Sequence, residues 1–500
     1  MLAWTIYSSF IGVALLLMLP REQVRLARIV ALLTAMAGLA IGLAAVPGAR
    51  ACGGLAPIVQ ARWIPTLGIK YELAADGISM TLVVLTGLAA VAGILFSWNV
   101  EHRAKEFFAF YLALIGGVYG VFLSFDLFLL FVFYELAIIP KYFLIAIWGS
   151  TRREYGAMKL ALYSFVGSAM VLVGLIAAYV AAGSKTMDLV ELAKFPFPEA
   201  MQMWAFPVVF VGFAILAGLW PFHTWAPTGH VAAPTAASML LAGVVMKLGA
   251  YGCLRVAMTL FPEGMEAWRN TLGVLAAVGI VYGALVALVQ KDFKFVIGYS
   301  SVSHMGFVLL GLLTLNSIGL SGAVLQMFSH GIVAGLLFAV VGRMVYDRTH
   351  TRELEKLEHM NLSRAMPFAA VTFTLASVAS MGMPGFSGFV AELQVLIGAW
   401  HGFPALGIVA GIGIVLGVAY ALRALQLAFF GDVRGPARAA ESPGHSATCL
   451  PPISIPERLG AILLIGTSLL VGLYPSLLLD LIHSSFSSSL FDWLPKGIGP

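Results

Sequence analysis

Long apolar runs dominate this chain and decide which solvent surrounds it. The hydrocarbon core of a bilayer is about 30 Å thick, so a helix of about 20 apolar residues can cross it. Because 60% of the 500 residues are hydrophobic and only 11% are charged, the chain lacks the polar surface that a water-soluble protein needs. The sequence therefore predicts an all-α integral membrane protein with about 14 transmembrane helices, at residues 2–20, 27–46, 76–98, 107–124, 126–149, 155–182, 204–222, 234–258, 271–290, 293–314, 317–345, 365–400, 404–429 and 457–476.

The basic residues indicate how these helices are oriented. Lys and Arg in short loops stay on the cytoplasmic side of a membrane. With the loops assigned alternately to the two faces, 19 Lys and Arg residues fall on one face and 8, Arg255 among them, on the other, while Lys141 and Lys247 lie inside helices. The chain is therefore predicted to lie in a bacterial inner membrane with both termini in the periplasm. The first run lacks a basic start and a cleavage site, so it is predicted to be a helix rather than a signal peptide.

Two of the predicted helices are interrupted by proline and glycine. The interruptions are GLWPFHTWAPTGHVAAPT at residues 218–235 and SMGMPGFSGF at residues 380–389. Broken helices in corresponding halves of a chain are typical of transporters with internal repeats. We predict two related five-helix units at 107–258 and 271–430, preceded by helices at 1–106 and followed by a polar cytoplasmic loop at 431–456 and a C-terminal helix and tail at 457–500. Two unrelated proline kinks are the alternative interpretation, because Pro and Gly are common in membrane helices.

Ionisable side chains inside the predicted helices are the strongest functional signal. A charge at the centre of a bilayer costs at least ~2.5 to 3.5 kcal/mol on insertion scales, and such residues usually relay protons or ions inside the protein. Five of them lie on five different helices and are predicted to form one buried axis: Glu135, Lys247, His304, His330 and Glu392.

Some buried polar residues also have a structural interpretation. A neutral histidine serves equally well as a relay or as a hydrogen-bond partner, and His304 follows serines that it could contact. His223 and His230 flank the first interruption, where their rings could satisfy freed backbone groups, so they are second-tier candidates. Asp126 stands at the start of its predicted helix and is interpreted as a capping or interfacial carboxylate.

Five segments, taken together and in order, resemble the antiporter-like chain M (chain 4 in mitochondria) of respiratory complex I: FYELAIIPKYFLIAIWG, PFHTWAPTGHVAAPTAASMLLAGVVMKLGAYG, QKDFKFVIGYSSVSHMGFVLLG, SHGIVAGLLFAVVGRMVYDRTHTREL and MGMPGFSGFVAEL. The resemblance covers residues 70 to 430 and is specific as a combination. It implies a fourteen-helix subunit with two inverted five-helix repeats that carries protons from cytoplasm to periplasm along a central hydrophilic axis. The wider superfamily includes subunits of multisubunit sodium/proton antiporters.

The resemblance also implies roles for the buried residues. Glu135 looks like the family's fifth-helix glutamate, Lys247 like its central eighth-helix lysine and Glu392 like its twelfth-helix acidic exit residue. His304 and His330 fall on the histidine positions of the connecting path. Neighbouring antiporter-like chains are the implied partners, and quinone, flavin and iron-sulfur clusters are expected in partner subunits.

The chain departs from the family in the partner of its fifth-helix glutamate. The family pairs that residue with a lysine on the seventh helix, five residues before a proline that is Pro221 here, and this position is Leu216. The acidic residue usually found just before the second histidine is also missing, with Thr228 and Gly229 in its place.

An anionic glutamate in a low-dielectric interior needs a cation or a raised pKa. Lys141 lies six residues after Glu135, about 9 Å along the helix axis, and the proline between them could bend the helix. We therefore predict that Lys141 partly replaces the missing cation. The alternative is that Lys141 extends its ammonium to the cytoplasmic interface near Trp148.

Three functions remain open from the sequence: a proton-translocating subunit of a complex I type enzyme, a subunit of a cation/proton antiporter, and a scaffold with an incomplete channel. Leu216 keeps the third alternative open. The chain itself is expected to hold no cofactor, because Cys52, Cys253 and Cys449 have no metal-ligand spacing and no phosphate-binding glycine loop is present.

Overall fold

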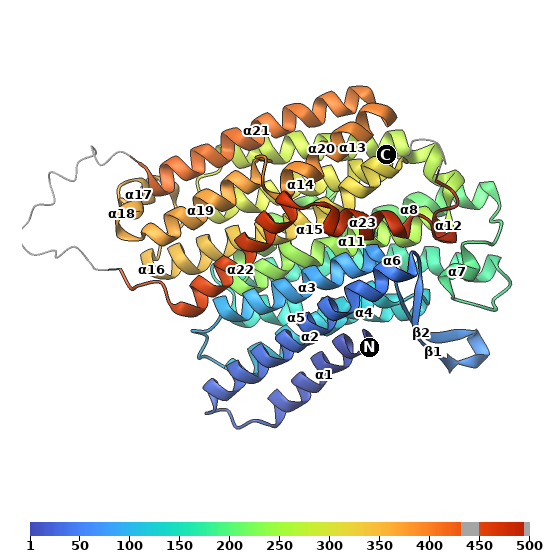
Figure 1. Ribbon diagram of the computed structural model, residues 1–500, viewed down its shortest axis with the longest axis horizontal. Coiled ribbons are helices and arrows are strands. Elements are labelled where there is room, and N and C mark those ends of the chain that lie inside the picture. The colour runs from blue at the N-terminus through green and yellow to red at the C-terminus, as the bar shows by residue number, and fades with distance from the viewer. Residues whose placement is uncertain (432–449, 495–500) are drawn as a thin grey trace, which may run out of the picture.

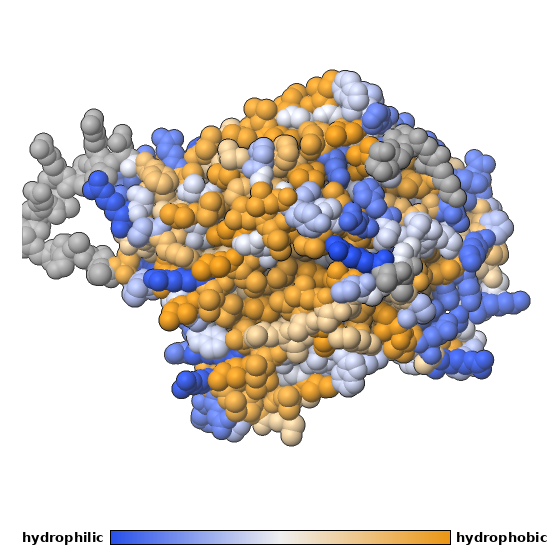
Figure 2. Space-filling view, viewed as in Figure 1, coloured by the Kyte–Doolittle hydropathy of each residue, from blue (hydrophilic) through white to orange (hydrophobic). Residues whose placement is uncertain are grey.

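A computed structural model describes residues 1–431 and 450–494 of the chain, so most of the predicted loop at 431–456 and the last six residues lie outside the described residues. The helices pack side by side in one common direction (Figure 1). Helices α16 to α18 lie at one end of this bundle, and β1, β2, α7 and α12 lie at the other. Apolar side chains cover the surface between the two ends (Figure 2). This band is the surface that a bilayer would cover.

Fourteen segments of the described chain cross this band. Twelve are helices long and apolar enough to span a membrane, and the shorter α1 and the broken pair α19 and α20 complete the set. The N-terminal helices are α1 (Ala3–Met18), α2 (Val24–Cys52) and α3 (Gly77–Phe96). The first predicted five-helix unit begins with α4 (Ala104–Leu123), α5 (Leu127–Trp148) and α6 (Arg153–Ala181). Its fourth span is the broken pair α8 (Glu199–Ala217) and α9 (Trp225–Ala232). Its fifth span is formed in order by α10 (Thr235–Leu240), η3 (Leu241–Val245), α11 (Met246–Gly252), η4 (Cys253–Ala257) and α12 (Met258–Leu260).

The second predicted unit also has five spans, with the broken pair again fourth. It consists of α13 (Pro262–Val289), α14 (Phe293–Leu313), a span formed by α15 (Ser317–Ala339), η5 (Val340–Tyr346) and α16 (Asp347–Thr349), the broken pair α19 (Pro367–Ser380) and α20 (Ser387–Gly402), and α21 (Pro404–Phe429). The short helices α17 (Leu354–Glu358) and α18 (Leu362–Ala365) precede α19, and α22 (Ile455–Leu473) is the last span. An odd number of spans in each predicted unit is compatible with the inverted repeats expected from the sequence, which stay a prediction.

The two predicted interruptions are real breaks in the fourth span of each unit. At the first, α8 ends at Ala217 and Gly218 adopts a left-handed φ of 87°. At the second, α19 ends at Ser380, and Gly382 and Gly385 have φ of 69° and 99°. Glycine tolerates positive φ without a steric cost, so these positions end the helices inside the bundle.

One β-hairpin and one amphipathic helix were not predicted from the sequence. β1 (Ala56–Ile64) pairs antiparallel with β2 (Ile69–Ala75), and α23 (Ser476–Ser485) lies at the same end of the bundle (Figure 1). The α23 helix packs directly on the start of α3, where the carbonyl oxygen of Leu481 occupies the space that a Cβ on Gly77 would need. The predicted all-α membrane fold is confirmed, and the hairpin is a small addition outside the spans.

Charged residues join the hairpin to the short helix α7 (Leu189–Leu192). The Lys70 ammonium lies 3.0 Å from a carboxylate oxygen of Asp188 and 3.0 Å from one of Glu191. Burial, together with the negative charge of Asp188, raises the pKa of Glu72 to about 7. The folded hairpin therefore holds a proton on Glu72 that the unfolded chain, with a pKa near 4.5, releases.

This pKa difference makes the hairpin less stable at high pH. The stabilisation from a raised carboxyl pKa is complete below about pH 4.5 and is lost as the pH rises through about 7. Glu72→Gln is expected to increase the thermal stability of the purified protein at pH 8.5 and to change it much less at pH 5. Glu191→Gln is the control, and it should lower stability at pH 8.5 because Lys70 loses a partner. An equal effect of Glu72→Gln at both pH values would contradict this account.

Candidate functional site

Lys247 and His330 form the closest contact of the predicted axis. The Lys247 ammonium lies 2.7 Å from Nδ1 of His330, which α15 brings across from the second unit. It also donates to the carbonyl oxygen of Ala242 in the π-helical segment η3. Both side chains are buried, and Lys247 has no exposed surface. A wide π-helical turn next to a buried lysine is a local irregularity of the kind found at functional sites.

Two glycines allow the helices to approach closely enough for this contact. A Cβ on Gly331 would lie 2.6 Å from the carbonyl oxygen of Gly243 and 2.7 Å from a methyl group of Leu85. Neither neighbour can move without shifting a helix, since one is backbone and the other is buried. Small residues thus fix the spacing of η3 and α15 beside Lys247 and His330.

Gly331→Ala is expected to separate Lys247 from His330 and to slow proton transport. The added methyl group overpacks the contact, which typically costs 1–3 kcal/mol, about as much as the hydrogen bonds it displaces. Gly335→Ala, four residues further along α15, is the matched control because a Cβ there meets no atom within 4 Å. Proton uptake by vesicles containing each variant measures the effect. An equal loss of proton uptake in both variants would show that the glycine content of α15, and not the spacing between η3 and α15, limits transport.

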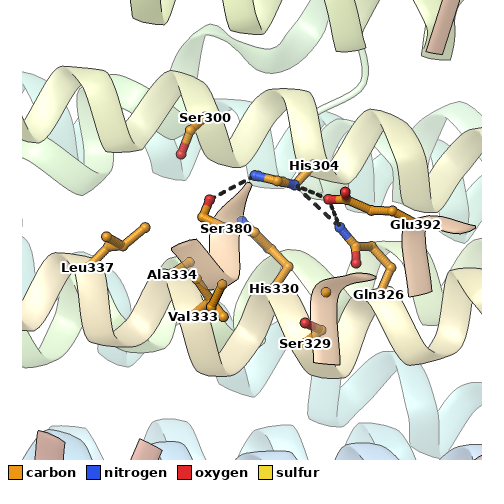
Figure 3. Close-up of a pocket in the computed structure, with 12 residues that line it drawn as sticks. Ser300, His304, Gln326, Ser329, His330, Val333, Ala334, Leu337, Ser380 and Glu392 are labelled. Carbon is orange, nitrogen blue, oxygen red and sulfur yellow. Dashed lines mark hydrogen bonds and ion pairs between the residues drawn. The ribbon is translucent and has the colours of Figure 1, made fainter. Parts of the chain in front are cut away.

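His304 and Glu392 continue the contacts from His330. The rings of His330 and His304 are 5.4 Å apart between centroids, and Nδ1 of His304 lies 3.2 Å from Oε1 of Glu392. The Gln326 side-chain amide is within 3.3 Å of both of these atoms and donates to the carboxylate. Figure 3 shows His304 reaching from α14, His330 and Gln326 from α15, and Glu392 from α20 toward one another.

The other ring nitrogen of His304 also has polar partners. Its Nε2 lies 3.2 Å from the Ser380 hydroxyl and 3.3 Å from the Tyr420 hydroxyl. A small cavity of about 10 Å³ lies beside the two histidines, with Ser300, Ser329 and Glu392 also in its lining. This volume is close to the smallest that holds one water molecule.

The row of titratable side chains formed by Lys247, His330, His304 and Glu392 is called the file below. Each of its members can take up and release a proton. Each of these groups lies close to the next, from the lysine through the two imidazoles to the carboxylate, so a proton on one changes the electrostatic energy of a proton on its neighbour. An imidazole can accept at one nitrogen and donate at the other, which is the property a relay needs. Four predicted residues, Lys247, His330, His304 and Glu392, are thus brought together from four spans.

Glu135 and Lys141 do not join this file. Glu135 is half-buried on α5 beside Ser168 of α6, and its Oε1 has no hydrogen-bond partner among the described residues. Lys141 is 1% exposed, and within the described part of the chain its ammonium makes no hydrogen bond or ion pair. A direct pair with Glu135 is therefore not formed, and extension to the aqueous interface is wrong as well. Leu216, at the family's lysine position, is buried in the last turn of α8.

Two buried cations were missed or misplaced by the sequence analysis. Lys294, at the start of the helix predicted at 293–314 but not named as a candidate, is buried in the first turn of α14. It donates to the carbonyl oxygen of Ala233 at 2.9 Å and to the Ser238 hydroxyl at 3.3 Å. A cavity of about 210 Å³ on the cation-rich face reaches Lys294. Arg255, counted with the loop cations of one face, is fully buried in η4 and pairs with Asp76 at 2.5 Å.

The second-tier residues have different outcomes. Asp126 caps α5, because its Oδ1 accepts from the amides of Phe128 and Leu129 at 3.0 Å each, as predicted. His230 is fully buried next to the first break, but neither of its ring nitrogens has a partner among the described residues. The prediction that its ring satisfies freed backbone groups is therefore wrong. The His223 ring packs against Tyr282, with 5.1 Å between centroids.

Comparisons with known proteins show similarity along most of the chain. A family profile described as NADH:quinone oxidoreductase/Mrp antiporter, TM, matches residues 124–417. The chain is 39% identical over 445 residues to NADH-quinone oxidoreductase subunit M of Rhodobacter capsulatus, covering 86% of this chain and 84% of the relative. No group of three or more His, Cys, Asp or Glu residues that could hold a metal ion occurs within the described ranges.

Solved structures share the fold along almost the whole chain. A chain of respiratory complex I from Thermus thermophilus with bound NADH matches with a TM-score of 0.87 and 28% identity, over 99% of this chain and 100% of that one. A chain of the Mrp complex from Dietzia sp. DQ12-45-1b matches with a TM-score of 0.84 and 23% identity, over 98% and 97%, which is a likeness of fold alone.

Proposed function

The chain belongs to the NADH:quinone oxidoreductase/Mrp antiporter family, as an M-type (chain 4) antiporter-like subunit, and we propose that its buried file of titratable side chains is the route along which it moves protons. It is a proton-translocating membrane subunit of a complex I type NAD(P)H:quinone oxidoreductase. The observation that carries the proposed route is the series of close approaches from Lys247 to His330 at 2.7 Å, from His330 to His304 with 5.4 Å between ring centroids, and from His304 to Glu392 at 3.2 Å.

The route has a natural entrance and direction. The cation-rich face, which we assign to the cytoplasm by the distribution of Lys and Arg, carries the cavity that reaches Lys294. From there Ser238 and the carbonyl oxygen of His230 lead inward along the broken span. Glu392 lies on α20, the half of its span that continues to the opposite face. In this proposal protons enter near Lys294 and leave beyond Glu392. The distribution of Lys and Arg supports an orientation with both ends of the chain on the periplasmic side of a bacterial inner membrane.

The chain works as part of a multisubunit membrane complex. Membrane subunits of this type carry no redox cofactor, so we place quinone, flavin and iron-sulfur clusters in partner subunits and other antiporter-like chains beside this one. Affinity purification of the tagged chain in mild detergent tests this assignment. Recovery of flavin and iron-sulfur subunits with quinone reductase activity is the expected result. Recovery with small antiporter chains and no redox subunit would instead assign the chain to a cation/proton antiporter.

In this proposal, Lys141 supplies the positive charge that is missing because Leu216 stands at the family's lysine position. It does so although Lys141 and Glu135, both on α5, form no direct pair. A buried ammonium without a hydrogen-bond partner is costly unless it serves the nearby carboxylate electrostatically or releases its proton. Lys141→Leu is therefore expected to lower proton transport by roughly tenfold, which corresponds to about 1.4 kcal/mol. Ile139→Leu, at an exposed apolar position of the same helix, is the control. Unchanged transport in Lys141→Leu would rule out a role for this lysine.

A further inference from the structure

A second cavity on the cation-rich face lies beside the proposed entrance at Lys294, because Val231 lines it and the Val231 carbonyl oxygen also accepts from Lys294 at 3.5 Å. It has a volume of about 400 Å³ and is formed where the start of α6, the end of α9 and the start of α14 meet. None of the residues of the file from Lys247 to Glu392 lines it. Its lining comprises Thr151, Arg152, Tyr155, Thr228, Val231, Ala232, Asp292, Phe295 and Arg352.

The cavity carries an excess of positive charge. Its one acidic residue, Asp292, is already neutralised, because Oδ2 pairs with Arg352 at 3.3 Å and Oδ1 accepts from two amides of α14. Arg152 makes no ion pair among the described residues. Lys159, about two turns further along α6, stands next to the lining and donates to the neutral Thr228 hydroxyl at 3.4 Å, and it too forms no ion pair within the part of the chain that the structure describes. Two cations at this wall are therefore available to an anion.

The surroundings of the cavity identify the kind of anion. Tyr155 lies at its edge, with the Lys159 ammonium 5.9 Å from the ring centroid. Below it, the outer side of α6 exposes an apolar stripe that runs toward the membrane centre: Met158, Leu162, Phe165 and Val166, all between 49% and 57% exposed. A polar, cation-lined cavity above an apolar stripe fits a molecule with a phosphate group and acyl chains.

We propose that this cavity binds the phosphate headgroup of an anionic phospholipid from the leaflet on the cation-rich face. Arg152 and Lys159 hold the phosphate, since an arginine fork and a lysine ammonium are the usual phosphate partners. The acyl chains lie along the apolar stripe of α6. Charge complementarity and this continuous apolar surface favour a lipid over an acidic protein segment, which would leave the stripe uncovered.

The test counts lipids bound to the intact complex that contains the chain. Complexes are reconstituted into vesicles of phosphatidylcholine and phosphatidylglycerol, extracted in mild detergent, and weighed by native mass spectrometry. The Arg152→Gln/Lys159→Gln variant is expected to lose the most strongly retained phosphatidylglycerol. The control, Arg62→Gln/Lys185→Gln, removes the same charge from a cavity of about 200 Å³ at the opposite end of the bundle and should retain it. Equal retention in the two double variants would overturn the proposal.

One further variant and one wash condition distinguish a bound phospholipid from free phosphate and from a bound polypeptide. Thr228→Asp supplies an internal anion to Lys159 without removing a cation, and it should also weaken lipid retention even if the double variant fails to assemble. Inorganic phosphate in the wash should leave the lipid bound, because the acyl chains anchor it. Displacement of the lipid by phosphate alone, or loss of a polypeptide from the variant complex in place of a lipid, would contradict a phospholipid site.

Discussion

Replacing Lys247 by arginine is expected to abolish proton transport by this chain while preserving its fold. Arginine keeps the buried positive charge next to His330 but does not release a proton in proteins. Proton transfer by a positioned acid or base contributes about 100-fold to 10⁴-fold to a rate, so the loss at this step should be at least about 100-fold. The number of protons pumped per electron by the assembled complex in vesicles measures the effect.

The control for this experiment is Lys291→Arg. Lys291 is exposed at the surface, pairs with Glu355 at 3.0 Å, and lies outside the route, so its variant should pump normally. Lys247→Ala should match Lys247→Arg in its loss of pumping. If arginine restored what alanine removes, Lys247 would act only as a fixed charge. If neither variant changed the proton count, the chain would be a scaffold.

Glu392→Gln is expected to have an effect of the same size. Glutamine keeps the shape and the contact with Gln326 but cannot ionise, so His304 loses its acidic partner. Protons that reach His304 then have no group to pass to on α20. The proton count per electron should fall as in Lys247→Arg, with the complex still assembled.

A second buried glutamate provides a matched control. Glu457 is 1% exposed and pairs with Arg343 at 2.6 Å and Arg348 at 2.7 Å, far from the histidines in the sequence and outside their contacts. Breaking a buried ion pair typically costs 3–5 kcal/mol, so Glu457→Gln should lower thermal stability. Its proton count per assembled complex should remain normal. A drop equal to that of Glu392→Gln would indicate that packing, not titration, limits transport.

The membrane-spanning architecture could be predicted from the sequence because its signals are local. Runs of apolar residues locate the helices, and Gly218 and Gly382 end helices inside the bundle through a conformation that glycine favours. The β-hairpin and α23 were missed because both are short and lie outside the apolar runs. Arg255, near the end of the helix predicted at 234–258, was counted with the loop cations of one face. The sequence alone does not show that Asp76, far away in the chain, lies 2.5 Å from its guanidinium.

The site was predictable only in part, for the same reason. Lys247, His304, His330 and Glu392 stand out because each is ionisable within an apolar helix. Gln326 and Tyr420 are neutral, so nothing in the sequence connected them to His304. One signal was present, since Gln326 precedes His330 by four residues and therefore shares its helix face. The lack of a direct pair between Lys141 and Glu135 was not foreseeable, because it depends on how α5 packs against its neighbours.

The central claim is that one shared route passes through Lys247 and Glu392. The most direct test compares the proton count per electron in Lys247→Arg, Glu392→Gln and the variant that carries both substitutions. Residues that act as one unit give strongly non-additive losses. The account predicts that the double variant pumps no fewer protons than either single variant. Additive losses, with each substitution removing a separate share of the pumped protons, would show that the two residues serve different routes.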